Sequence, residues 1–320
     1  MNDELTFAER VAQRLIEQLE QGTAPWQKPW NPGVDSLPMN PTTGKRYRGI
    51  NALWLLAQGY DDPRWCTYRQ ALAQGWQVKR GAKAASIEYW QFEDERRNEK
   101  GENERVPLPH PRVFWASVFH ASQIQNIPSV LPLGHVWDAN ERAETILRES
   151  GATIEHEYGS RALYSPTLDV IRLPGRSQFP DAARYCATAL HELGHWTGHA
   201  SRLNRDLSGA FGSELYAREE LRAEIASFML GMEIGVGHDP GQHAAYVQSW
   251  IKALKDDPRE IFRASADAEK IHGFVKQFDK HLDLERIQEP VKEIGRAIAE
   301  VPEKIKEVGK VLEATLELAP

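Results

Sequence analysis

The motif His191-Glu192-Leu193-Gly194-His195 constrains this 320-residue chain more than any other feature of its sequence. It reads H-E-x-x-H. Residues 181–190, which precede it, contain neither Pro nor Gly and place apolar side chains at helical spacing, so the motif is predicted to lie on an α-helix. Residues four apart share one helix face. His191 and His195 can therefore both offer an imidazole nitrogen to a single metal ion, with Glu192 beside them.

A metal ion held in this way predicts hydrolytic chemistry. Two neutral imidazoles and one carboxylate leave a coordination position open for water, which the metal acidifies and Glu192 can deprotonate. Before the helix, residues 169–173 read as a strand, followed by a loop bounded by Gly and Pro. A strand beside a metal-binding helix is the layout of zincin metallopeptidases, in which the strand lines the substrate cleft. The predicted reaction is hydrolysis of a peptide bond.

The third metal ligand can come from two places. Metzincins continue the motif as H-E-x-x-H-x-x-G-x-x-H, and Gly198 occupies the Gly position of that pattern. Ser201, however, stands where the third His is required. His199 lies two residues too early, so we expect it beside the site or on the surface.

The other source is a carboxylate on the following helix, as in gluzincins. Residues 214–235 are rich in Ala, Leu, Ile, Phe and Met at spacings that predict a helix with one buried face. Within it, E-x-x-A-E resembles the gluzincin arrangement in which the first Glu binds the metal. We therefore expect Glu220 to be the ligand and Glu224 to hydrogen-bond a ligand imidazole. Glu219 and Glu214 are weaker candidates, and a solvated acidic face is the alternative.

The amino-terminal third differs from the whole chain in charge. The chain carries a net charge of −7, which argues against uniform coating by nucleic acid. Residues 26–83, in contrast, hold nine basic and three acidic residues, and five of the ten Trp residues. Basic groups neutralise phosphates and aromatic rings stack on unpaired bases, so this region is predicted to bind single-stranded DNA. Alternatively these Trp are core residues among solvated cations, and Trp54 in NALWLLA is expected to be buried.

The overall pattern predicts an α+β fold with two domains. Residues 76–78 and 85–92 are expected to pair as a hairpin, and the charged run at 93–106 to be a flexible tip or insertion. Residues 154–159 and 161–174 are expected to form antiparallel strands before the metal helix. The chain has no run of eighteen apolar residues, no apolar leader and two cysteines, so we expect a cytoplasmic protein with reduced thiols and no membrane partner.

Five segments of the first 130 residues carry a family pattern. They are GTAPWQKPW, NPTTGKRYRGIN, the W-x-T-Y-x-Q-A segment at residues 65–71, VKRGAKA and VFHASQIQNIP. In this order they resemble the ArdC family of antirestriction proteins, whose amino-terminal module also appears in TraC-type plasmid primases. The resemblance implies a single-strand DNA-binding domain (1–128), a linker (129–135) and a zincin-like metallopeptidase domain with a helical end (136–285). It does not cover the amphipathic helical tail (286–320).

The same resemblance implies His191, His195 and Glu220 as metal ligands and Glu192 as catalytic base, with Zn²⁺ expected and Mn²⁺ as the alternative. It implies an antirestriction protein of a mobile element that protects incoming DNA in a bacterial host, with a restriction–modification subunit as a candidate substrate. Two alternatives stay open: a protein that coats single strands with a structural zincin domain, and an accessory module of a plasmid primase system. The candidate DNA contacts are Trp26, Lys28, Trp30, Lys45, Arg46, Tyr47, Arg48, Asn51, Lys79, Arg80 and Lys83.

Overall fold

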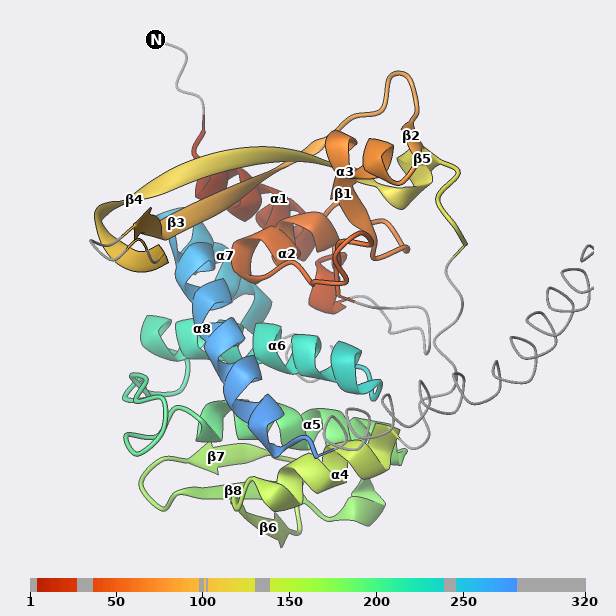
Figure 1. Ribbon diagram of the computed structural model, residues 1–320. Helices are drawn as coiled ribbons and strands as arrows, with labels where there is room; N and C mark the ends of the chain where they lie inside the picture. Colours follow the sequence, from red (N-terminus) through yellow and green to blue (C-terminus); the bar gives the residue numbers. More distant parts are fainter. Residues whose placement is uncertain are drawn as a thin grey trace, which may run out of the picture.

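The structure, a computed structural model, has the α+β architecture that the sequence predicts (Figure 1). It describes residues 5–27, 37–97, 101, 103–129, 139–238 and 246–280. A long two-stranded arm lies at one end of the molecule and a three-stranded sheet at the other, with helices between them. The predicted tail (286–320), all but the first residue of the predicted linker (129–135), Lys28 and Trp30 lie outside the described residues.

Short helices and a sheet make up the amino-terminal unit. Its elements are α1 (Phe7–Glu20), η1 (Pro25–Gln27), α2 (Gly49–Leu56), β1 (Trp65–Thr67), α3 (Tyr68–Ala73), β2 (Gln77–Val78), β3 (Ala85–Arg97), β4 (Asn103–His120), η2 (Ala121–Gln123) and β5 (Ile124–Gln125). Helix α1 begins at a capping box, in which Thr6 Oγ1 accepts from Glu9 N at 3.3 Å and Glu9 Oε2 accepts from Thr6 N at 2.6 Å. Thr67 and Gln70 start α3 in the same way.

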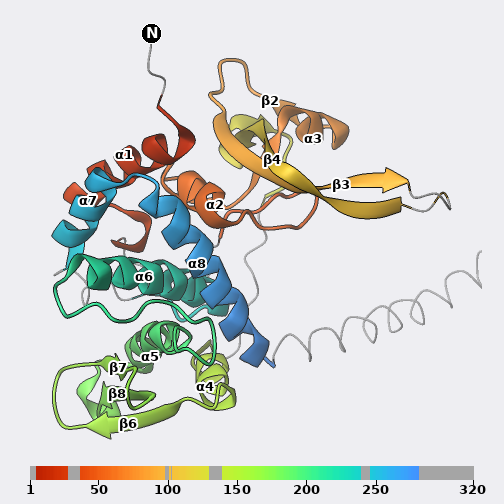
Figure 2. The ribbon, with the colours of Figure 1, turned by 90° about the vertical axis from the view of Figure 1, so that its left-hand side faces the viewer.

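Strands β3 and β4 form the arm, which extends beyond the helices in Figure 2. The prediction of a flexible tip over 93–106 is wrong where the structure describes it, because residues 93–97 and 103–106 continue the two strands. Opposite charges face each other across this part of the arm, as in the pair Glu95 and Arg105. Such cross-strand pairs explain why so polar a stretch adopts strand structure.

The carboxy-terminal unit surrounds the H-E-x-x-H helix. Its elements are α4 (Ala139–Glu149), β6 (Thr153–Glu157), β7 (Leu163–Ser165), β8 (Val170–Pro174), η3 (Arg176–Gln178), α5 (Ala182–Trp196), α6 (Glu214–Ile234), α7 (Val247–Asp256), α8 (Glu260–Val275) and η5 (Lys276–Phe278). Helix α5 packs on β7 and β8 on one side and on α6 on the other. The predicted metal helix therefore lies between the sheet and the second predicted metal helix.

Two predicted strand pairings are wrong. β2 pairs with β5 rather than with β3, whose neighbour is β4. In the second sheet the order is β6-β8-β7, with β6 parallel to β8 and β7 antiparallel to it. Local sequence placed these strands but carried no information about partners distant along the chain. As a result β8 is the central strand of this sheet, and β6 and β7 are its edge strands.

The two units share one hydrophobic core. Helix α1 packs against α7, and α2 packs against α8. The buried side chains of Phe7, Val11 and Leu15 belong to the same cluster as Trp250 and Ile261. Helices α1 and α2 of the amino-terminal unit therefore pack into the core of the carboxy-terminal unit. Two small clusters of described residues, one beneath the arm and one around β2 and β5, are internal to the amino-terminal unit.

Both cysteines are buried thiols without a disulfide. Cys66 lies on β1 in the amino-terminal unit, whereas Cys186 lies on α5. None of the helices in the described ranges is long and apolar enough to cross a membrane.

The shared core predicts that the two units unfold together. Leu15 is fully buried, so Leu15→Ala should lower the free energy of unfolding of the whole chain by about 2–5 kcal/mol. Leu72→Ala, at a position 55% exposed, is the control and should change stability by less than about 0.5 kcal/mol. The free energy of unfolding of both variants is measured by guanidinium unfolding, followed by Trp fluorescence and far-UV circular dichroism. Two separate transitions, only one of them shifted by Leu15→Ala, would contradict the shared core.

Candidate metal centre and nucleic-acid interface

Helix α5 brings the H-E-x-x-H residues into the interior of the carboxy-terminal unit. Asp181 caps the helix, since its Oδ1 accepts from Arg184 N at 2.8 Å. His191, Glu192 and His195 are 2%, 6% and 9% exposed, respectively. Burying three polar side chains is unfavourable unless partners compensate them, so their surroundings indicate what the site holds.

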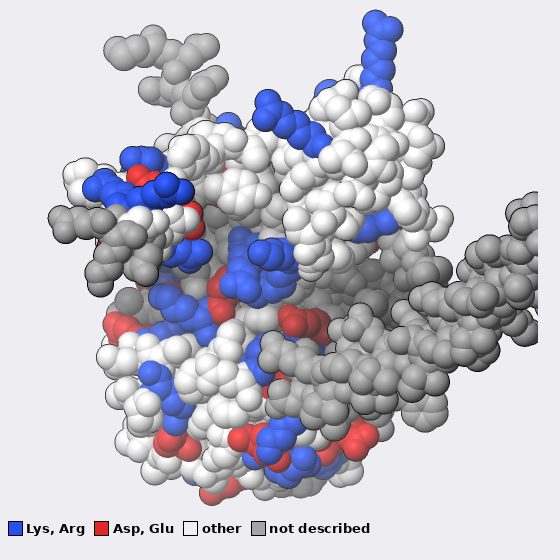
Figure 3. All heavy atoms as spheres, viewed as in Figure 1, with Lys and Arg blue, Asp and Glu red and all other residues white. Residues whose placement is uncertain are grey.

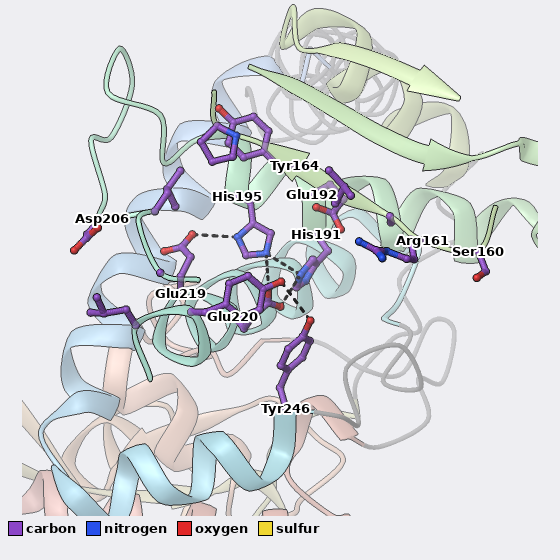
Figure 4. Close-up of a pocket in the computed structure, with 17 residues that line it drawn as sticks. Ser160, Arg161, Tyr164, His191, Glu192, His195, Asp206, Glu219, Glu220 and Tyr246 are labelled. Carbon is purple, nitrogen blue, oxygen red and sulfur yellow. Dashed lines mark hydrogen bonds and ion pairs between the residues drawn. The ribbon is translucent and has the colours of Figure 1, made fainter. Parts of the chain in front are cut away.

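Two imidazoles and one carboxylate converge on a single point (Figure 4). His191 Nε2 lies 3.1 Å from His195 Nε2, and the Glu220 carboxylate oxygens lie 3.5 and 3.4 Å from these two nitrogens. Tetrahedral ligands at bond lengths of roughly 2.0–2.1 Å are about 3.3 Å apart. The donor set therefore fits one divalent metal ion and leaves a fourth position for water.

The second nitrogen of each imidazole faces another carboxylate of α6. His191 Nδ1 lies 3.5 Å from Glu224 Oε2, and His195 Nδ1 lies 3.2 Å from Glu219 Oε1. Arg205 holds Glu219 in place, donating from Nη2 to Oε1 at 2.7 Å and from Nε to Oε2 at 3.1 Å. Carboxylates in these positions fix the ring orientation and leave the opposite nitrogens available to a metal.

Sequence reasoning missed the contacts behind these carboxylates. It placed Glu224 beside an imidazole but treated Glu219 only as a weaker ligand candidate. His238 Nε2 lies 3.0 Å from Glu224 Oε1. A Cβ on Gly231 would lie 1.9 Å from the Gly237 carbonyl oxygen, so only glycine allows the loop to approach α6 so closely. Neither contact has a local sequence signal, because each depends on how a loop folds back on α6.

The electrostatics of this cluster favour a bound cation. Burial lowers the pKa of His191, but the hydrogen bonds with Glu220 and Glu224 outweigh it and raise that pKa to about 9. Burial raises the pKa of Glu220, yet the positive charges and hydrogen bonds of both imidazoles hold it well below its usual range. The site thus attracts positive charge, and a metal ion would replace the protons on the imidazoles.

A cleft of about 500 Å³ opens beside the cluster. Burial raises the pKa of Glu192, and the backbone of Tyr164 on β7 is hydrogen-bonded to its carboxylate. On the other wall, the hydroxyls of Tyr216 and Tyr246 lie 3.3 Å apart, and Tyr246 points toward the His191–Glu220 cluster in Figure 4. Burial, followed by the charge of Glu220, keeps the pKa of Tyr216 far above its usual range, so its hydroxyl stays protonated.

Two predicted aromatic DNA contacts belong to the core instead. Trp26 is fully buried and packs edge-on against Trp250, with ring centroids 6.4 Å apart. Tyr47 is 6% exposed, and its hydroxyl donates to the Trp65 carbonyl at 2.9 Å. Neither ring has a face that a base could reach. Assigning them to DNA was wrong because composition does not distinguish an exposed aromatic side chain from a buried one.

Two of the polar residues predicted to contact DNA instead form hydrogen bonds within the protein. Arg46 donates from Nη1 and Nη2 to the Glu269 carboxylate on α8 at 3.0 and 2.6 Å. Asn51 bonds the backbone of Glu88, with Nδ2 donating to its carbonyl at 2.7 Å and Oδ1 accepting from its N–H at 3.0 Å. Arg46 therefore ties the two units together, and Asn51 holds the base of the arm to α2. These contacts leave them poorly placed to bind DNA.

The remaining predicted cations that the structure describes are exposed. In Figure 3, blue Lys and Arg side chains stand apart on a mostly uncharged amino-terminal surface. Lys79 donates from Nζ to the Ser122 carbonyl at 2.7 Å, which fixes its position on the loop after β2. The exposed candidates are Lys45, Arg48, Lys79, Arg80 and Lys83.

Several exposed aromatic side chains lie on the arm, outside the set of predicted DNA contacts. Tyr89 and Phe114 face each other across β3 and β4 and are 46% and 49% exposed. Trp90 and Trp115 lie on the opposite face, where Trp90 contacts Phe262 of α8. The clustering of aromatic residues at 89–92 and 114–115 was the available signal, but strand propensity explained it equally well.

The fold and the site together define a zincin-like protein with an added amino-terminal unit. Residues 141–267 match the family described as zincin-like metallopeptidase, and residues 6–117 match the N-terminal domain of anti-restriction factor ArdC. The chain belongs to the ArdC family of antirestriction proteins. This membership confirms the resemblance seen in the sequence.

Solved structures of the ArdC protein from plasmid R388 are similar over almost their whole length. The metal-free structure has 37% sequence identity and a TM-score of 0.70, covering 87% of this chain and 99% of that chain. The Mn(II)-bound structure has 36% sequence identity and a TM-score of 0.70, and the match covers 86% of this chain and 98% of that chain. The family thus includes a protein that binds a divalent metal ion.

Curated relatives differ in length. DNA primase TraC of Escherichia coli is 58% identical over 295 residues, which are 88% of this chain but 20% of the primase. A second DNA primase TraC of Escherichia coli is also 58% identical, over 289 residues, which are 86% of this chain and 27% of that primase. The chain therefore spans about a quarter of these primases or less. Uncharacterized protein y4eC of Sinorhizobium fredii is 35% identical over 279 residues, 83% of this chain and 90% of that protein.

The carboxylates behind the imidazoles should control metal affinity. Glu219→Ala removes the partner of His195 Nδ1 and leaves Arg205 without its carboxylate, so Zn²⁺ affinity should fall about 10- to 100-fold. Glu214→Ala is the control, because Glu214 lies on the same helix but pairs with Arg218 at the surface. Competition with a chromophoric chelator measures both variants. Equal affinity of Glu219→Ala and the parent would refute the orienting role.

Proposed function

We propose that this chain hydrolyses peptide bonds at the His191–His195–Glu220 cluster and binds single-stranded DNA through its amino-terminal unit, protecting DNA of a mobile element from restriction. The observation that carries the peptidase half is that each imidazole has one nitrogen against Glu220 and the other against Glu219 or Glu224. Two imidazoles favour Zn²⁺, whereas the Mn(II)-bound relative supports Mn²⁺. A restriction–modification subunit is the candidate protein substrate.

The residues around the cluster suit hydrolysis. A divalent ion bound there supplies an acidified water and polarises the substrate carbonyl. Glu192 is placed to accept a proton from the attacking water as the water oxygen adds to the carbonyl carbon. Glu192 can then pass this proton to the amine that leaves when the C–N bond breaks. Tyr246 points toward the same space and is placed to donate to the carbonyl oxygen. The free edge of β7 offers backbone groups that can align an extended peptide.

The DNA half of the proposal relies on the arm and the exposed cations. Aromatic faces on the arm can stack on unpaired bases without reading their sequence, while Lys and Arg follow the phosphates. Family membership and the match to the ArdC amino-terminal domain support this assignment.

A second candidate function is suggested by the TraC primases, which share 58% identity with the chain over a small part of their length. In that role the same module would handle single strands in a plasmid primase system, and its metal site would be structural. The substitution of Glu192 tests the difference.

Glu192→Gln should separate metal binding from hydrolysis. The substitution keeps the size of the side chain, but an amide cannot accept the proton from water. Peptide cleavage should therefore fall at least about 100-fold while Zn²⁺ affinity stays within a few-fold. Glu155→Gln on β6, which is exposed, is the control. Cleavage is followed by mass spectrometry on a protein mixture and on peptide libraries. A Glu192→Gln variant as active as the parent would rule out this catalytic base.

Aromatic and basic residues should contribute to DNA binding in different ways. Replacing Tyr89 and Phe114 by Ala should weaken binding of an unstructured single strand by roughly 1–3 kcal/mol per lost stack and leave the salt dependence unchanged. Replacing Lys45 and Arg48 by Ala should flatten the plot of log affinity against log salt concentration by about 0.7 per lost phosphate contact.

The control for these variants is Phe211→Ala, at an aromatic residue 81% exposed in the carboxy-terminal unit. Fluorescence anisotropy over a salt titration, on single-stranded and duplex DNA, measures all of them. If the arm variant bound single strands as tightly as the parent, the arm would not be the stacking surface.

A further inference from the structure

Among the described residues that line the cleft, Arg161 is the one Lys or Arg side chain. Arg161 lies between β6 and β7, is exposed, and lines the cleft together with Glu192. In Figure 4 its guanidinium points from the β7 side toward Glu192 and His191. Burial raises the pKa of Tyr246 on the opposite wall, and the Arg161 charge acts against that rise. The Arg161 side chain therefore faces the space that a substrate would occupy.

Arg161 has no anionic partner within the protein as far as the structure describes it. No carboxylate of the described residues lies within ion-pair distance of its guanidinium, although the cleft also contains Glu192, Glu220, Glu219 and Asp206. Glu219 is paired with Arg205, and Glu220 is paired with the imidazoles of His191 and His195.

Neighbouring arginines of the same sheet region are paired. Arg172 lies 3.2 Å from Glu157, and Arg202 lies 2.5 Å from Asp169. Arg161 thus differs from them in keeping its hydrogen-bond donors available to a ligand. A guanidinium presents a planar set of donors that matches a carboxylate.

Tyr216 and Tyr246 line the opposite wall of the cleft. Beside this wall, Phe211 is 81% exposed and its ring contacts those of Tyr216 and Tyr246, with centroids 5.3 and 6.4 Å apart. Leu207 and Leu215 line the same side. Contiguous apolar surface along a cleft is typical of ligand-binding grooves, whereas a single exposed apolar residue is not. The two walls therefore offer different chemistry to the two sides of a peptide.

We propose that Arg161 is a specificity-determining residue, and that the cleft selects peptide segments with an acidic side chain on the β7 side of the scissile bond and a large apolar side chain on the side lined by Leu207 and Leu215. This inference depends on the proposed peptidase function and adds the class of substrate to it. A neutral or basic side chain would leave the Arg161 guanidinium either without a partner or facing a like charge.

The test uses the full chain loaded with Zn²⁺ and carrying Glu192→Gln, so that peptides bind without turnover. The probes are fluorescein-labelled peptides that hold one Phe and differ only in Glu, Gln or Lys at each neighbouring position. Glu peptides should bind roughly two- to five-fold tighter than Gln peptides at one position, and the difference should shrink with added salt. Arg161→Glu should reverse the order so that Lys peptides bind best, and Arg161→Lys should keep the original order.

Arg259→Glu is the matched control. Arg259 is an exposed arginine before α8 that does not line the cleft, so the same charge change there should leave peptide preference unaltered. The corresponding variants with Glu192 intact give kcat and KM for the peptides that are cleaved. Arg161→Glu should change KM according to peptide charge and leave kcat nearly constant.

Three results would overturn the inference. If the ratio of the affinities for Glu peptides and Lys peptides were the same in Arg161→Glu and the parent, Arg161 would not select the substrate. An equal loss of kcat for all peptides would show that Arg161 acts on Glu192 instead. If no peptide of any charge were bound or cleaved, this inference would fail together with the proposed peptidase function, whereas the first two results would leave that function standing.

Discussion

The contact between α5 and α6 determines what the carboxy-terminal unit can do. One face of α5 presents His191 and His195, and α6 presents three carboxylates to them from positions 219, 220 and 224. Because Glu219 and Glu220 are adjacent and Glu224 follows one turn later, the acids reach the two rings from different directions. One carboxylate lies between the rings and one lies behind each ring. A small sliding of α6 along α5 would break all of these contacts together.

Such a cluster is unfavourable for folding by itself. Three carboxylates and two imidazoles are removed from water, and a buried charge without compensation is strongly destabilising. Arg205 compensates Glu219 and His238 faces Glu224, so the remaining negative charge is concentrated on Glu220, between the rings. The protein fixes the outer groups with its own side chains and leaves the centre to a divalent cation. We therefore expect the acids behind the rings to affect metal affinity as well as the ligands themselves.

The sequence predicted what is encoded locally. Periodicity located α5 and α6, and H-E-x-x-H with E-x-x-A-E named the residues that converge, because each motif lies within one helix. Long-range relations were not accessible: β2 pairs with β5, β6 is parallel to β8, and Arg205 reaches Glu219 from a loop. The burial of Trp26 could not be predicted from the sequence for the same reason, because its partner Trp250 lies more than two hundred residues further along the chain.

The shared core changes how the two units can be related. Relative motion of domains is expected unless their interface is large and apolar. Here α1 and α2 complete the core formed by α6, α7 and α8, and Arg46 joins Glu269 at the edge of that core. Glu269 also accepts from Gly49 N at 2.8 Å, at the start of α2. An ion pair that also fixes the start of a helix resists rotation of one unit against the other. The base of the arm is therefore held at a fixed position relative to the cleft beside His191 and His195.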